Sequence, residues 1–221
     1  MDIAYQNQLK ESIMYMRKKK LLYNTITSLF HQIITILSGF ILPKLLLNYY
    51  GSSINGLVSS ITQFLGFVAF LELGVGAVVQ STLYKPLAEK DNNKISQILV
   101  SAEKFFRRIA LIFAIYTIVL MIVYPFFMLD DYDYFFTFSL ILVISISSFA
   151  QYYFGITNLL LLNADQMAYI PLLIQSGTII LNTVASAFLI KLGSNIQIVK
   201  LTTSLIFILR PLLMAFYVYR H

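Results

Sequence analysis

Three ionisable side chains, His31, Glu72 and Arg210, lie inside long apolar stretches of this sequence. Each lies ten to thirteen residues from the charged flank of its stretch, or about 15–20 Å along a helix. That distance predicts a position near the middle of a lipid bilayer. A charge there costs about 2.5–3.5 kcal/mol on insertion scales, so a partner, water or a charged ligand must compensate it.

Arg210 is open to three interpretations. It could form a buried pair with Glu72 that neutralises both and only fixes packing, or the two could flank a polar cavity. In a cavity the guanidinium would be available to a phosphate, whose geometry it matches. In the third interpretation, Arg210 extends towards the cytoplasmic membrane surface. Lys44 lies at the outer end of the first apolar stretch, where its chain is expected to reach the surface. The candidate substrate-binding residues are therefore His31, Lys44, Glu72 and Arg210.

Polar residues also follow helical spacing inside the apolar stretches. In the first stretch they are spaced four, three, four and three residues apart, which places them on one helix face: Asn24, Ser28, His31, Thr35 and Ser38. Such a stripe either forms hydrogen bonds to a neighbouring helix or lines a water-filled cavity. Hydrogen bonding between helices is favoured for the stripes at residues 148–158 and 175–186, which contain Ser148, Gln151, Gly155, Asn158, Gln175, Thr178, Asn182 and Ser186.

Long uncharged stretches divide the 221 residues and predict six membrane-spanning helices. The chain is 58% hydrophobic and only 12% charged, against about half and a quarter in soluble domains, which argues against a soluble enzyme. We expect an all-α integral membrane protein, with residues 1–221 forming one six-helix lobe. The spans are expected at about 21–47, 54–83, 107–129, 134–163, 167–190 and 197–219, joined by a partly helical cytoplasmic connection at 84–106.

The basic residues predict the orientation of these spans. Five lie in residues 10–20 and six in residues 85–108, whereas Lys44, Lys191 and Lys200 fall on or near the other side. By the positive-inside rule both termini are cytoplasmic, in a multi-pass protein of the cytoplasmic membrane. The same bias explains the net charge of +6 without a nucleic-acid partner.

The residues give little support to an enzyme. The sequence has no cysteine, no Walker A loop and neither an H-E-x-x-H nor a G-x-S-x-G motif, and its two histidines are far apart. Asp130 and Asp131 fall in a short outer loop, where solvation is a better explanation than metal binding. We therefore expect no catalytic residue, no metal and no cofactor.

Three stretches resemble the N-terminal lobe of bacterial polysaccharide flippases, in the multidrug/oligosaccharidyl-lipid/polysaccharide exporter superfamily. Their order and spacing within six spans carry the resemblance, because no single match is specific. They are Leu42-Pro43-Lys44 through Tyr50-Gly51 to Asn55-Gly56-Leu57; Leu71-Glu72-Leu73-Gly74-Val75-Gly76 with Tyr84 to Ile95; and Leu161-Leu162-Asn163-Ala164-Asp165-Gln166 with Tyr169 and Asn182.

The resemblance implies one lobe of a two-lobed transporter whose central cavity opens alternately to each side of the membrane. The implied function is flipping of a lipid-linked oligosaccharide across the cytoplasmic membrane in surface polysaccharide biosynthesis. The resemblance also implies basic residues that hold the pyrophosphate in the cavity. Arg210 and Lys44 are the candidates, and only because of their location. Family members have twelve or more helices, so the chain is expected to be truncated or to pair with a second six-helix lobe or a second copy of itself. Membrane lipids are its other expected partners.

Two alternatives remain open. One is half of a drug/cation antiporter of the same superfamily, whose members usually carry an acidic residue in the first helix. Residues 21–43 contain none, although Glu72 could couple ions. The other is a non-transporting remnant or an assembly scaffold.

Overall fold

The computed structural model describes residues 3–220, with the side chains of residues 18–70 and 74–220. The described chain is almost wholly helical and contains no strand, which confirms the all-α prediction. The elements are α1 (Ile3–Gly66), α2 (Ala69–Glu89), α3 (Asn92–Val123), the 3₁₀ helix η1 (Tyr124–Met128), α4 (Tyr134–Ala150), the π-helical turn η2 (Gln151–Gly155), α5 (Ile156–Ala164), α6 (Tyr169–Lys191) and α7 (Ile196–Arg220).

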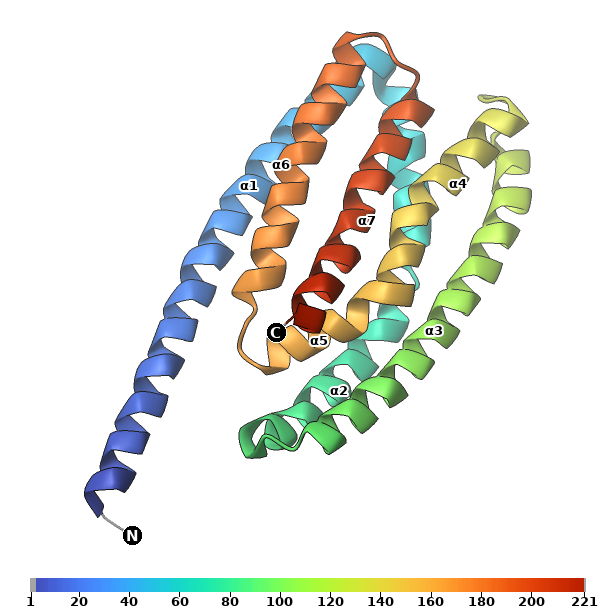
Figure 1. The fold of residues 1–221 in the computed structure, drawn as a ribbon. Coiled ribbons are helices and arrows are strands. Elements are labelled where there is room, and N and C mark those ends of the chain that lie inside the picture. The colour runs from blue at the N-terminus through green and yellow to red at the C-terminus, as the bar shows by residue number, and fades with distance from the viewer. Residues whose placement is uncertain (1–2, 221) are drawn as a thin grey trace.

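α1 consists of two helices that meet at Gly51. This residue has φ 81° and ψ 171°, a conformation open almost only to glycine, and the chain reverses direction there (Figure 1). The second helix continues to Gly66 and is followed, after a turn at Phe67 and Val68, by α2. The span expected at 54–83 is therefore divided between α1 and α2.

The helices run back and forth between two ends of the bundle (Figure 1). We call them the Gly51 end, with the turns at Gly51, before α4 and before α7, and the α2–α3 end, with the α2–α3 and α5–α6 turns and the end of α7. At the Gly51 end, the Tyr50 hydroxyl donates to the Ser194 carbonyl at 2.5 Å, and Ser53 is hydrogen-bonded to the Tyr132 hydroxyl. These bonds tie the three turns together.

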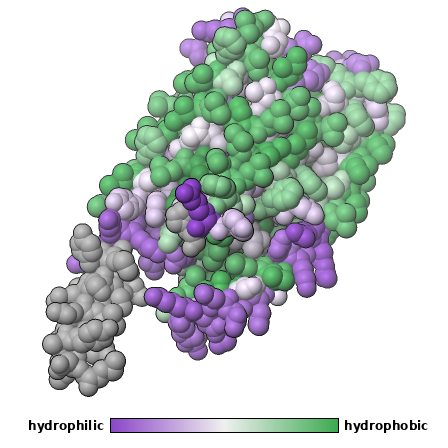
Figure 2. Space-filling model, viewed as in Figure 1, coloured by the Kyte–Doolittle hydropathy of each residue, from purple (hydrophilic) through white to green (hydrophobic). Residues whose placement is uncertain are grey.

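The outer surface of the bundle suits a membrane. Five helical stretches of the described chain are long and apolar enough to cross one: Lys18–Gly66, Asn92–Met128, Tyr134–Ala164, Tyr169–Lys191 and Ile196–Arg220. The most apolar window of each is only 6% to 39% buried, so most apolar side chains face outwards. Figure 2 shows hydrophobic residues over the middle of the bundle and hydrophilic residues towards its two ends. These features are those of a multi-pass membrane protein.

The connection expected at 84–106 is mainly helical and turns sharply. α2 continues to Glu89, and α3 begins only two residues later, after Lys90 in the left-handed conformation (φ 55°). Asp91 caps α3 by accepting a hydrogen bond from the backbone N–H of Lys94 at 3.1 Å. This bond stabilises the carboxylate and lowers the pKa of Asp91. α3 thus begins well before the predicted span at residue 107.

The span expected at 134–163 is interrupted by the π-helical turn η2. A Cβ atom placed on Gly155 would lie 2.9 Å from the Cβ of Pro211, so α7 approaches the bulge as closely as only glycine allows. Pro211 lies inside α7, which runs as one helix from Ile196 to Arg220. The bulge and Pro211 together set how α4 and α7 pack beside Arg210.

Candidate functional site

α1 and α6 are held together by a ladder of polar contacts. Its three rungs on α1 are seven residues apart, and each partner on α6 lies 145 positions further along the chain. A constant offset means that the helices run parallel and in register, and the seven-residue spacing is that of a coiled-coil seam. The rungs are Asn24 Oδ1 accepting from Tyr169 N–H (2.8 Å), His31 Nδ1 with Ser176 Oγ (3.1 Å) and Ser38 Oγ with Thr183 Oγ1 (2.7 Å).

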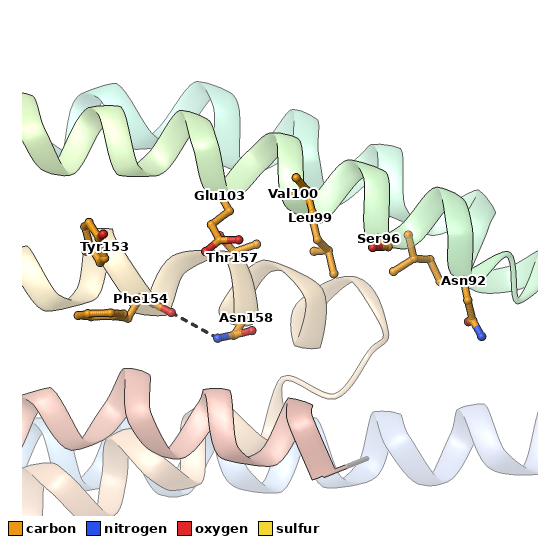
Figure 3. Close-up of a pocket in the computed structure, with 10 residues that line it drawn as sticks. Asn92, Ser96, Leu99, Val100, Glu103, Tyr153, Phe154, Thr157 and Asn158 are labelled. Atoms are coloured by element: carbon orange, nitrogen blue, oxygen red, sulfur yellow. Dashed lines mark hydrogen bonds between the residues drawn. The ribbon is translucent and has the colours of Figure 1, made fainter.

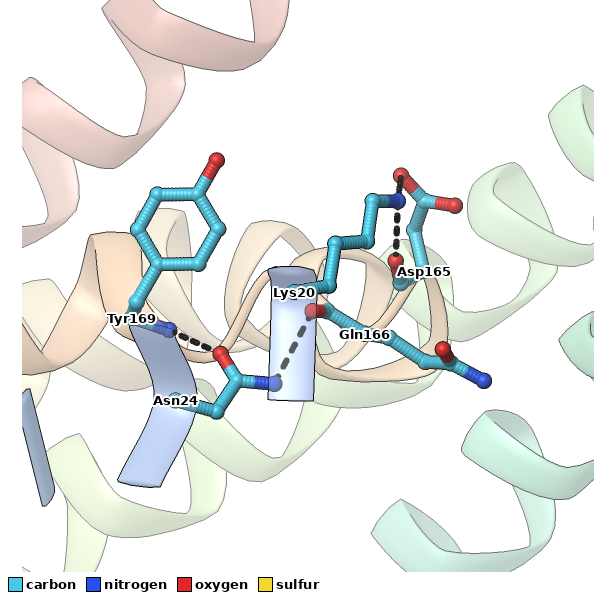
Figure 4. A network of polar contacts seen from close by, with 5 residues as sticks. All are labelled: Lys20, Asn24, Asp165, Gln166 and Tyr169. Atoms are coloured by element: carbon cyan, nitrogen blue, oxygen red, sulfur yellow. Dashed lines mark hydrogen bonds and ion pairs between the residues drawn. The ribbon is translucent and has the colours of Figure 1, made fainter. Parts of the chain in front are cut away.

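The ladder ends at the α5–α6 turn, shown in Figure 4. Lys20 Nζ donates to the Asp165 carbonyl at 2.8 Å and lies 3.2 Å from the Asp165 carboxylate. Asn24 Nδ2 donates to the Gln166 carbonyl at 3.0 Å, while its Oδ1 accepts from the N–H of Tyr169. One amide side chain thus satisfies two backbone groups of the turn, where Gln166 adopts the left-handed conformation.

The predicted stripe on α1 therefore has two uses. Asn24, His31 and Ser38 bond to α6 through the ladder. Thr35 and Ser38 line an open groove, and the Thr35 hydroxyl also donates to the His31 carbonyl at 2.8 Å. Ser28 is exposed. Part of the stripe thus forms hydrogen bonds to α6, and part of it lines this groove.

This open groove, which we call the central groove, has a volume of about 630 Å³ and lies between both halves of α1, α6 and α7. Its walls mix aliphatic side chains with hydroxyl and amide groups. The polar ones on α1 and α6 include Thr35, Ser38, Asn55, Ser59, Gln63 and Asn182. A groove of this kind can hydrogen-bond a polar ligand at membrane depth.

One face of α7 brings two positive charges to the central groove. Lys200, Thr203, Phe207 and Arg210 all line it and are spaced three, four and three residues apart. Lys200 and Arg210 are separated by about 15 Å along the helix axis. The described residues that line the groove include no carboxylate, and among the described side chains neither cation forms an ion pair. The groove therefore favours an anionic ligand.

Arg210 is held by neutral groups. Its Nε donates to Thr178 Oγ1 at 2.7 Å, and its guanidinium carbon lies 3.8 Å from the centroid of the Phe207 ring. The Thr178 hydroxyl itself donates to the Gln175 carbonyl at 2.8 Å, which leaves its oxygen lone pairs for Arg210. The side chain is fixed in place while its charge stays unneutralised by these contacts.

Arg210 and Phe207 also line a second cavity, the α4 cavity, of about 330 Å³. It extends towards the end of α7 and is lined by further polar groups: Ser147, Ser148, Gln151 and Gln175. Ser148, Gln151 and Gln175, which the sequence led us to expect between helices, thus face a cavity. Arg210 lies where the two cavities meet.

The other candidate residues lie in different surroundings. His31 is half-buried in the ladder, where its Nδ1 faces Ser176 of α6. Lys44 is exposed on α1, next to Pro43, which lines the central groove. The side chain of Glu72 lies outside the described residues, so its pairing with Arg210 stays a prediction.

Lys200 is a charged groove residue that the sequence analysis did not select. Its position near the predicted outer flank of the last span pointed to a surface lysine. The structure places it in the second turn of α7, half-buried and lining the groove. The signal was present in the spacing, since Lys200 shares a helix face with Arg210.

A further cavity of about 430 Å³ lies between α3 and α5, near the α2–α3 end (Figure 3). Its lining includes one carboxylate, Glu103, which forms an ion pair with Arg107 one turn later. The Arg107 guanidinium lies 5.2 Å from the centroid of the Tyr153 ring. This charge is already matched, unlike the two cations of the central groove.

No protein-family model, curated protein or solved structure matches the chain. Within the described residues, no cluster of three or more His, Cys, Asp or Glu side chains could hold a metal ion. The chemistry of the central groove is therefore the guide to function.

Proposed function

We propose that this chain is one lobe of a flippase that moves a lipid-linked oligosaccharide across the cytoplasmic membrane. One observation carries the proposal. The central groove brings Lys200 and Arg210 together with hydroxyl and amide side chains, and its described lining has no carboxylate. The resemblance of three stretches to bacterial polysaccharide flippases points to the same function.

The physical need for such a groove is clear. A glycan headgroup and its phosphates cannot enter hydrocarbon, because each polar group left without a hydrogen bond costs several kcal/mol. Hydroxyl and amide groups can replace water around the sugars. Arg210 can bind a phosphate through the N–H groups that do not face Thr178.

The lobe would work with a second lobe or a second copy of the chain. The central groove is open, and the most apolar window of α1 is only 6% buried, so a facing bundle would cover both. With the basic α2–α3 end in the cytoplasm, the groove would receive its substrate from the inner leaflet.

A drug/cation antiporter is less well supported. Positive charge repels a cationic substrate or coupling ion, and the described lining of the groove contributes Lys200 and Arg210 but no carboxylate. The non-transporting alternative predicts that the groove residues can be changed without effect on transport.

The test is complementation in a bacterial host that lacks its own flippase and expresses a matching second lobe. We expect the chain to restore surface polysaccharide, and Arg210→Ala to insert normally but restore little. The matched control is Lys191→Ala, which removes an exposed lysine from the last turn of α6. Full activity of Arg210→Ala, or no activity of the inserted, assembled parent, would refute the proposal.

A further inference from the structure

We propose that α7 carries two successive anion sites, Arg210 near mid-depth and Lys200 nearer the Gly51 end, between which a substrate phosphate passes. This inference rests on the proposed function, and it adds a second binding site and an order of binding. The ligand class is a phosphate or diphosphate ester.

Lys200 meets the requirements of a binding site better than those of a surface lysine. It is half-buried, and no hydrogen bond or ion pair joins its ammonium to any other described side chain. A half-buried cation in an apolar setting needs a counter-charge or water. Lys191, by contrast, is exposed at the end of α6, where a lysine favours the helix dipole.

The two cations form separate sites. Side chains of a helix lean towards its N-terminus, so Lys200 leans towards the Gly51 end and Arg210 towards Phe207. The stacking of the Arg210 guanidinium on the Phe207 ring agrees with this direction. The separation of about 15 Å along the axis is thereby preserved, and one phosphate contacts one cation at a time.

The cavities give the sites an order. Arg210 lines both the α4 cavity and the central groove, whereas Lys200 lines the central groove. An anion that arrives through the α4 cavity therefore meets Arg210 first. Between the two cations, the α7 face offers Thr203 and Phe207 and no carboxylate, so no fixed charge repels an anion on the way.

The experiment measures binding of inorganic pyrophosphate to the purified full chain by ³¹P NMR titration. The titration is carried out at an ionic strength that screens exposed charges, so that pyrophosphate binds only weakly to surface lysines. We expect two bound equivalents in the parent. Lys200→Gln and Arg210→Gln should each weaken one site about tenfold to a hundredfold and retain the other. Lys200→Arg should retain both, and Lys191→Gln is the matched control.

Two outcomes would overturn the second site. The first is that Lys200→Gln binds two equivalents as the parent does, and the second is that the parent binds one equivalent that either substitution abolishes. In both cases the proposed function still stands if Arg210→Ala loses transport in the complementation assay. Size-exclusion profiles and the behaviour of Lys200→Arg separate lost binding from lost folding.

Discussion

Gly155→Ala should destabilise the protein, although alanine is the better helix former. Gly155 lies at the end of the π-helical turn, against α7. An added Cβ would lie 2.9 Å from the Pro211 Cβ and 2.7 Å from Gln151 Oε1. The Gln151 side chain can rotate away. The Pro211 ring is fixed to the backbone of α7, so the helices themselves must separate.

The magnitude follows from two opposing effects. Carbon atoms pack best at about 3.5–4.0 Å, so the contact at 2.9 Å requires a shift of roughly half an ångström or more. Overpacking of this kind costs about 1–3 kcal/mol, and the gain in helix propensity returns about 0.5–1 kcal/mol. The difference lies between about 0 and 2.5 kcal/mol, and its middle value of about 1 kcal/mol lowers the melting temperature of a chain of this size by about 2–4 °C.

The assay is thermal unfolding of the purified protein in detergent, followed by far-UV circular dichroism. Gly177→Ala is the matched control, because Gly177 is also helical and, apart from its own stretch of helix backbone, has no atom within 4 Å of its would-be Cβ. It should be neutral or stabilising by about 0.5–1 kcal/mol. If Gly155→Ala unfolds at or above the temperature of Gly177→Ala, the close approach of α7 to the bulge is wrong.

Three further predictions concern the ladder and the turns. Asn24→Leu leaves two backbone groups of the α5–α6 turn unpaired and should cost about 1–3 kcal/mol, whereas exposed Ser28→Leu should stay within about 0.5 kcal/mol in the same melts. Gly51→Ala forces φ 81° on alanine and should cost about 1–3 kcal/mol. The control is Gly39→Ala, inside a helix, which should be neutral or stabilising. Equal melting temperatures for the two variants would contradict this prediction. The lowered pKa of Asp91 means that its cap is present above the pKa of the unfolded chain and is lost as pH falls through the folded value. Amide hydrogen exchange at the start of α3, corrected for intrinsic rates, should become faster in acid in the parent but not in Asp91→Asn. The same acid response in both proteins would refute the role of the Asp91 cap.

The fold was predictable to the extent that charge and hydropathy set it. Uncharged stretches located the long helices, because apolar length is what a membrane selects. The breaks inside them were not predictable. The π-turn at Gln151–Gly155 and the turn at Phe67 and Val68 lie in apolar sequence with no charge or proline to mark them. Such breaks depend on the packing of neighbouring helices, which periodicity along one chain does not report.

The site was predictable in part. Arg210 was found because a charge in an apolar stretch needs an explanation. The stripe on α1 was found from its spacing, but only partners on α6, 145 residues away, could decide between hydrogen bonding and cavity lining. Lys200 was missed because it lies near the start of the last predicted span, where a lysine is expected at the membrane surface. Helix-face spacing from Arg210 was a better guide than distance from the end of the span.

α6 links the two parts of the site. One face of it bonds to α1 through Ser176 and Thr183, and Thr178 on another face holds Arg210. The α1 wall of the central groove and the cation inside it therefore share one support. Because that support offers a hydroxyl and not a carboxylate, it positions the guanidinium without neutralising it. A carboxylate at position 178 would hold Arg210 more tightly but neutralise it, and Lys200 would then be the one unpaired cation in the described lining of the groove.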